Sequence, residues 1–169
     1  MQRRTATHRT EALFSDDDIF RFDLRWRWGE GKLLVAWLLN PATATEIILD
    51  RSVLRIMHEA KKLNLAGFLI VNLYAYRSTD FEAVPSETED CRLENERHIL
   101  EVLTEAAREG WPVVAAWGED GRRKQDWAIS LARDAGTPLL RFGNLTSRYK
   151  APRHPGRMSN NIKLVPWID

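Results

Sequence analysis

The sequence predicts an α/β protein: a three-layer α/β/α sandwich with a mainly parallel central sheet and an N-terminal antiparallel edge strand. Two patterns lead to this prediction. Apolar runs with the length of buried strands recur along the chain, at 32–40, 65–76, 112–118 and 137–143. Helical patterns separate them, and strands that alternate with helices are typical of a parallel sheet covered on both faces.

A further strand is predicted at Ile19–Trp28, because apolar and charged residues alternate strictly there. One face would carry the apolar side chains, and the solvent face would carry Arg21, Asp23, Arg25 and Arg27. Glycines at 29 and 31 then turn the chain. This arrangement indicates a hairpin between Ile19–Trp28 and the apolar run 32–40.

Helices are predicted from the spacing of apolar residues and from the breakers at their ends. They cover Arg51–Leu63, about Asp90–Glu109 and Gly121–Gly136. Right-handed crossovers between parallel strands place the C-terminal ends of these strands at one edge of the sheet. Ligands of open α/β sheets bind beyond that edge, so functional residues are expected there.

The composition is that of one globular domain over residues 1–169, with a flexible basic arm at 1–12. The single cysteine, Cys91, excludes a disulfide within the chain and favours a reducing, cytoplasmic setting. No apolar run approaches the roughly 20 residues that a membrane helix needs. Zinc-ligand spacings and glycine-rich nucleotide loops are absent, so we expect neither a metal nor a cofactor. The oligomeric state stays open.

Charge is unevenly distributed, although the net charge is only +1. Residues 141–163 contain six basic side chains and no acid, whereas residues 78–109 contain ten acids and three bases. The segments are either solvated faces of opposite sign or, for the basic one, a surface that binds anions. On the second interpretation, the phosphate-binding residues are Arg148, Lys150, Arg153, Arg157 and Ser159.

Polar and aromatic residues follow the predicted strands and are candidates for a site. His154 lies between Pro152 and Pro155, which hold its loop extended. An imidazole among arginines suits an anion or a developing oxyanion. The other candidates beyond the strand ends are Asn40, Asn72, Tyr74, Arg77, Trp117 and Gly118.

Each candidate also has a structural explanation. Asn40 before Pro41 suits the start of a helix, and Asn72 within an apolar run suits a buried hydrogen-bond network. Trp117 and Gly118 could form core and turn, Arg77 a surface charge, and the loop of His154 a connector. His58 and His98 lie on predicted helices and are expected to pack or to face solvent.

An ordered set of motifs resembles a family of uncharacterised bacterial proteins, domain of unknown function 1643. The set consists of LLNPATAT, Asp50 with Arg55, VNLYAYRSTD, Asn95, AAWG and PRHP. The resemblance runs from about Leu33 to Ser159 and implies no particular reaction.

The order of elements is also similar to the uracil-DNA glycosylase superfamily, on the motifs LLNP, IVN, AAWG and HPGRMS. This resemblance implies that Asn40 positions a water, that Asn72 reads a base, and that His154 stabilises charge on the departing base. Tyr74, Tyr76 or Trp117 would stack on that base.

These observations support three hypotheses. The first is a cofactor-independent hydrolase that cleaves the N-glycosidic bond of DNA or of a nucleotide, with a flipped base in the case of DNA. The second is a non-catalytic module that binds nucleic acid or nucleotide at the same edge. The third is a structural or interaction protein in which the loop of His154 is only a connector.

Overall fold

The computed structural model describes residues 1–83, 88–159 and 162–168. Within these residues the strands are β1 (Arg9–Phe14), β2 (Arg21–Arg27), β3 (Leu33–Leu38), β4 (Gly67–Asn72), β5 (Val113–Ala115), β6 (Leu139–Phe142) and β7 (Leu164–Ile168). The α-helices are α1 (Arg51–Lys62), α2 (Glu89–Glu109) and α3 (Gln125–Asp134). Short 3₁₀ helices lie at Phe81–Ala83, Glu119–Lys124 and Pro155–Arg157.

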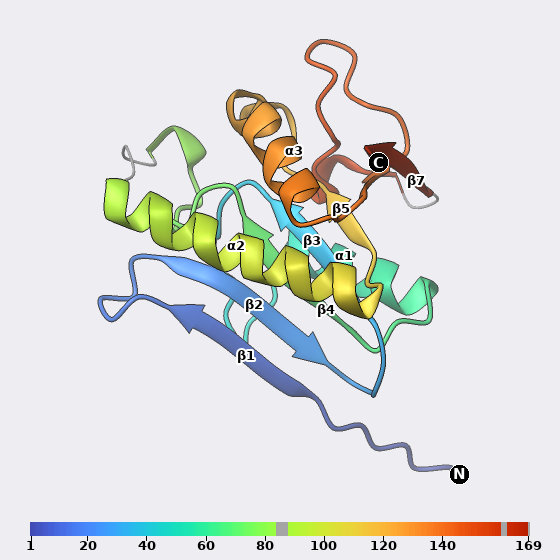
Figure 1. The fold of residues 1–169 in the computed structure, drawn as a ribbon. Coiled ribbons are helices and arrows are strands. Elements are labelled where there is room, and N and C mark those ends of the chain that lie inside the picture. Colours follow the sequence, from blue (N-terminus) through green and yellow to red (C-terminus); the bar gives the residue numbers. More distant parts are fainter. Residues whose placement is uncertain (84–87, 160–161, 169) are drawn as a thin grey trace.

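The described strands form one mixed sheet in the order β1-β2-β4-β3-β5-β6-β7 (Figure 1). The central strands β4, β3, β5 and β6 run parallel to one another. Antiparallel strands flank them on both sides, β2 with β1 on one side and β7 on the other. The α/β class is therefore confirmed. The expectation of a mainly parallel sheet is wrong, because three of these six pairings are antiparallel.

The predicted hairpin between the first two long strands is also wrong, because β4 lies between β2 and β3. The residue before β4 bonds to the end of β2 on one side and to the start of β3 on the other. Trp28 N donates to Ala66 O at 2.8 Å, and Ala66 N donates to Lys32 O at 2.8 Å. Every residue of β4 is buried, so this strand needs a partner on each side. Insertion between β2 and β3 provides both.

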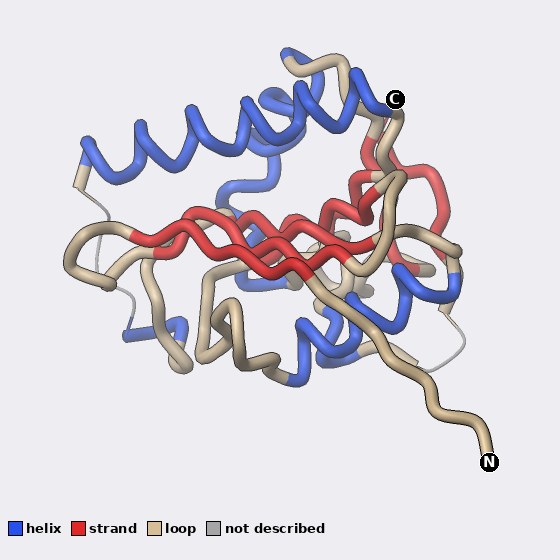
Figure 2. Tube along the Cα trace, turned by 90° about the horizontal axis from the view of Figure 1, so that it is seen from below, coloured by secondary structure: helices blue, strands red, loops and turns tan. Residues whose placement is uncertain are grey.

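Helices cover both faces of the sheet, which Figure 2 shows edge-on. Alternate residues of each central strand point to opposite faces. Val35, Trp37 and Val71 pack with α2 and α3, whereas Leu34, Ala36 and Ile70 pack with α1. Two hydrophobic clusters result, one on each face, and together they fix the strand ends that carry polar residues.

The strand β2 departs from the expected half-buried pattern. Arg21 and Asp23, placed on the solvent face by their alternation, are 2% and 8% exposed. Because β1 takes the edge of the sheet, β2 lies inside it. Asp23 is covered by α2, whose His98 Nε2 lies 3.0 Å from Asp23 Oδ2, and Arg21 donates to Ala44 O at 2.7 Å. Residues 9–12, within the segment expected to be an arm, belong to β1.

The predicted helices at 51–63 and at about 90–109 are confirmed within a residue. The predicted helix at 121–136 is split between the 3₁₀ helix Glu119–Lys124 and α3. Gly121 belongs to the tight 3₁₀ segment, where a Cβ would lie 2.4 Å from Trp117 Cδ1. The 3₁₀ segment therefore packs closely on Trp117 because position 121 carries no side chain.

Candidate functional site

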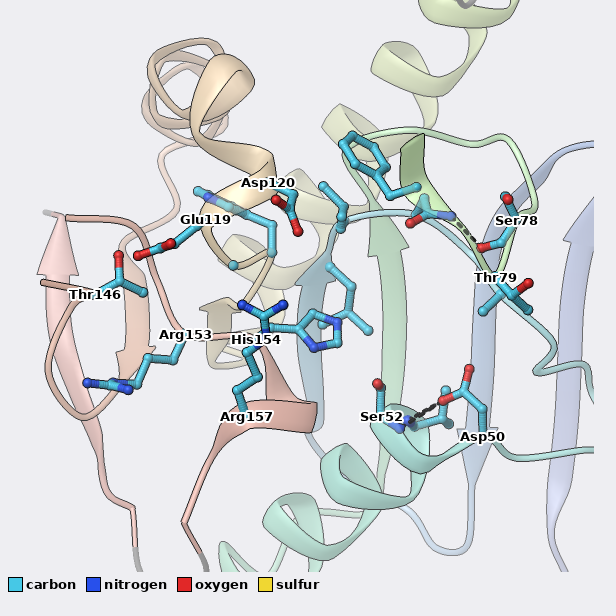
Figure 3. Close-up of a pocket in the computed structure, with 18 of the residues that line it drawn as sticks. Asp50, Ser52, Ser78, Thr79, Glu119, Asp120, Thr146, Arg153, His154 and Arg157 are labelled. Carbon is cyan, nitrogen blue, oxygen red and sulfur yellow. Dashed lines mark hydrogen bonds between the residues drawn. The ribbon is translucent and has the colours of Figure 1, made fainter. Parts of the chain in front are cut away.

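A cavity of about 490 Å³ opens at the edge of the sheet where β3 and β5 end. Segments far apart in the sequence form its walls: the residues after β3, the first turn of α1, residues 78–79, residues 117–120 and the loop of His154. Figure 3 shows His154 in the middle of this space, with Asp50 and Ser52 on one side and Glu119 and Asp120 on another.

The structure brings half of the predicted site residues together. Those that line the cavity are Asn40, Trp117, Gly118, Arg153, His154 and Arg157. Those that do not line it are Asn72, Tyr74, Arg77, Arg148, Lys150 and Ser159.

The loop of His154 is held in place by its neighbours. Pro155 begins a 3₁₀ helix, and His154 is the residue that caps it: its Nδ1 accepts a hydrogen bond from Gly156 N at 3.2 Å. Gly118 N donates to Pro152 O at 3.0 Å, and a Cβ on Gly118 would lie 3.1 Å from His154 Cβ. Gly118 also has a φ of +78°, which favours glycine. The two segments therefore fit closely because position 118 lacks a side chain.

This geometry fixes the protonation of the imidazole. Burial lowers the pKa of His154 below its ordinary value of 6.5, and the positive charge of Arg157 lowers it further. Asp50 and Asp120 oppose this effect without reversing it. At neutral pH the ring is therefore uncharged, and because Nδ1 accepts from Gly156, its proton is on Nε2. His154 thus offers one hydrogen-bond donor, Nε2–H.

Carboxylates are a part of the site that the strand-end argument missed. Asp50, Glu119 and Asp120 all line the cavity. Asp50 also caps α1, because its Oδ1 accepts from Ser52 N and Val53 N, each at 2.9 Å. In the described residues no hydrogen bond engages Oδ2 of Asp50. The signal available in the sequence was the acid just before a predicted helix, which is typical of a cap.

Asn40 lines the cavity and also ties two loops together. Its Nδ2 donates to Ser78 O at 2.8 Å and to Pro41 O at 3.0 Å. Ser78 N in turn donates to Pro41 O at 2.9 Å. These contacts commit the amide nitrogen, and no described residue donates to the Oδ1 of Asn40. The oxygen is therefore the atom of Asn40 that is left for a water or a ligand.

Asn72 lies behind the cavity instead of in its wall. Its side chain is fully buried, and its Oδ1 accepts from Arg21 Nη2 at 3.3 Å. Asn95 Nδ2 donates to the backbone oxygen of Asn72 at 3.1 Å. The structure thus places Asn72 in a buried network, and its side chain is linked to the cavity through Arg21.

The remaining candidates make other contacts. Tyr74 packs on Phe81, with ring centroids 5.2 Å apart, and Arg77 pairs with Asp18 at 2.7 Å. Arg148 lies over the ring of Tyr149, and Ser159 O accepts from Arg55 Nη2. Lys150 has a φ of +53° in an exposed turn. None of these five contributes to the cavity.

Arg21 is the second feature that sequence reasoning missed. It lines the cavity although only 2% of its surface is exposed. Its Nη1 donates to Ala44 O at 2.7 Å, and its Nη2 donates to Asn72 Oδ1. The alternation of β2 placed it on a solvent face, so no local signal could reveal its burial.

The described residues hold no group of three or more His, Cys, Asp or Glu side chains arranged for a metal. Across the same residues, the helices are all too short or too polar to cross a bilayer.

Comparison with protein families shows where the chain belongs. Residues 21–156 match the model of a family described as a protein of unknown function, DUF1643. The chain belongs to this family. The DUF1643 match begins at Arg21 and includes His154, so it contains two of the charged or titratable side chains that line the cavity. The strands β1 and β7 lie outside the match. No curated protein and no solved structure matches the chain.

Proposed function

We propose that this DUF1643 protein hydrolyses the N-glycosidic bond of a nucleotide, and that His154 donates its Nε2 hydrogen bond to the departing base. The fixed tautomer of His154 is the observation that carries this proposal. When the bond breaks, its electron pair leaves with the base, and negative charge builds on the base oxygens or nitrogens. A neutral donor already aimed at that charge lowers the barrier without first having to reorganise.

The cavity also holds groups suited to the attacking water. The reaction joins the water oxygen to C1′ of the sugar and frees one proton, which ends on the base. Asn40 Oδ1 and Asp50 Oδ2 both lack a donor among the described residues, and both residues line the cavity. We assign Asn40 to orient the water and Asp50 to accept its proton.

The dimensions of the cavity agree with a ligand of this kind. A volume of about 490 Å³ lies within the range of sites that enclose small molecules. Phe81 and Trp117 supply apolar surface, although Trp117 is only 1% exposed and contributes little of it. Charged groups line the same cavity, which suits a base with a polar sugar attached.

The test is release of free base, measured by chromatography, from a panel of nucleosides, nucleoside monophosphates and oligonucleotides with modified bases. We expect release from at least one substrate, and a loss of about a hundredfold or more in His154→Asn. Asparagine keeps a cap for the 3₁₀ helix and removes the imidazole. Substitution of the exposed His8, outside the cavity, by alanine is the matched control and should leave the rate unchanged.

The alternative of a non-catalytic binding module has a clear signature in the same panel. Binding of a nucleotide, lost in His154→Asn, without base release from any substrate would replace the hydrolase by that module. If Asp50→Asn, which preserves the cap of α1, retained full activity, the role of Asp50 as proton acceptor would be wrong.

A further inference from the structure

The side chain of Arg21 is a buried cation that forms no ion pair within the described residues. Its two hydrogen-bond acceptors, Ala44 O and Asn72 Oδ1, are both neutral. No described carboxylate lies within ion-pair distance of it, and its Nε has no hydrogen-bond partner among these residues. Buried charges in proteins are normally paired or hydrogen-bonded, so an anion that enters the cavity beside Arg21 meets a cation that has no direct ion pair with the described residues.

The environment of Arg21 keeps it charged despite this burial. Burial lowers the pKa of Arg21 to about 10, and Arg77 adds to this effect, whereas Asp50 and Asp23 oppose it. The guanidinium is therefore protonated at neutral pH. Two of its five N–H groups are used by the protein, so a ligand in the cavity could still accept hydrogen bonds from it.

The cavity that Arg21 lines also carries hydroxyl groups that suit an anion with several oxygens. They belong to Ser52, Ser78 and Thr79 (Figure 3), of which Ser78 Oγ already donates to Asp80 O at 2.6 Å. A guanidinium binds phosphates and carboxylates with two parallel hydrogen bonds, and of these two anions a nucleotide carries phosphate. Arg153 and Arg157 lie beside His154 (Figure 3), and the Nε of Arg153 donates to Asn144 O at 2.8 Å.

We propose that Arg21 binds the terminal phosphate of the substrate, so that the substrate is a free nucleoside monophosphate and not a residue within a nucleic-acid strand. This inference rests on the function proposed above for the base and the sugar. Only a group that enters the cavity reaches a side chain that is 2% exposed. A terminal phosphate does so at the end of the ligand, whereas a phosphodiester would require the strand to continue in both directions inside the wall.

Anion binding is measured without turnover, so that the result for the anion site does not depend on whether the protein releases a base. The probe is inorganic phosphate, titrated against the full chain at constant ionic strength, with the melting temperature as the readout. Phosphate should raise the melting temperature of the unaltered protein in a saturable way. In Arg21→Met its affinity should fall on the order of ten- to a hundredfold. Arg77→Met, the same substitution outside the cavity, should retain it.

The second readout is the preference for a nucleoside monophosphate over the matching nucleoside, as kcat/KM or as affinity. We expect this preference to disappear in Arg21→Met and to return in part in Arg21→Lys. Unchanged phosphate binding in Arg21→Met, or no binding by the unaltered protein, would overturn the inference. If Arg21→Met does not fold, Arg21→Lys decides, because full phosphate affinity there would contradict a bidentate contact.

Phosphate binding that depends on Arg21, combined with no base release, would refute the hydrolase and leave the anion site standing. Base release that prefers an oligonucleotide over the monophosphate would leave the hydrolase standing and refute the free monophosphate as its substrate.

Discussion

The imidazole of His154 shows how a single residue acquires a defined chemical state. Pro155 and Gly156 create one 3₁₀ turn, and the turn supplies the N–H that Nδ1 accepts. Burial and Arg157 then lower its pKa. The prolines made the position visible in the sequence, and the tautomer follows from the local turn. The lowered pKa instead depends on burial by segments distant in the chain.

The lowered pKa of His154 predicts a pH dependence of stability. Below pH 6.5 the unfolded chain takes up a proton on His154 more readily than the folded protein does, so the free energy of unfolding falls as pH falls. The effect begins near 6.5 and ends at the lower folded pKa, with a slope of at most about 1.4 kcal/mol per pH unit.

Urea unfolding of the protein and of His154→Asn, measured at about seven pH values between roughly 5 and 8, checks this prediction. The stability difference, protein minus variant, should rise with pH up to about 6.5 and stay constant above it. A difference that instead grows as pH falls would mean that the folded protein favours the charged imidazole.

Arg21 illustrates the limit of reasoning at the scale of residues. The strict alternation of Ile19–Trp28 correctly identified a strand and wrongly identified a solvent face. Both faces of β2 are covered at its start, by contacts with residues such as Ala44 and His98. Periodicity reports which residues share a face, and it does not report what packs on that face.

At the scale of elements, the close pairing of β4 with β2 and β3 depends on Gly67. A Cβ there would lie 2.2 Å from Trp26 O and 2.8 Å from Leu33 Cδ2. The first of these atoms belongs to the backbone and cannot move away without breaking the β2–β4 pairing. Close approach of the three strands is thus possible because position 67 carries no side chain.

Gly67→Ala should therefore lower the free energy of unfolding by about 3 kcal/mol or more, at the upper end of overpacking effects. Gly29→Ala is the matched control, since its Cβ would lie 4.0 Å from the nearest side chain, that of Ala66. Its effect should stay within about 1 kcal/mol. Chemical denaturation of both variants measures the two values, and equal values would show that Gly67 is not a point of contact.

At the scale of the whole molecule, aromatic contacts join the C-terminal strand to the site. Trp167 of β7 meets Trp117 at 5.8 Å between ring centroids, and Trp117 meets Trp37 at 5.6 Å. Trp117 also lines the cavity. Although β7 lies outside the DUF1643 match, it therefore packs against a residue that lines the cavity.

Trp167→Ala should destabilise the protein by about 1–3 kcal/mol, below the value for a fully buried tryptophan because Trp167 is half-buried. Unfolding should remain a single transition by both circular dichroism and tryptophan fluorescence, since β7 is part of one sheet. Pro166→Ala, on the exposed side of the same strand, serves as the control. Two separate transitions would show that β7 is an independent unit.

The sequence by itself determined the helices at 51–62 and 89–109, the central parallel strands and the position of His154. Local periodicity, caps and prolines encode these features, because each depends on residues close together in the chain. Only the tertiary structure decided the order of the strands, the burial of Arg21 and the exclusion of Asn72 from the cavity. Those outcomes depend on which distant segments pack together, through contacts such as the close approach at Gly67 and the hydrogen bond from Arg21 to Ala44.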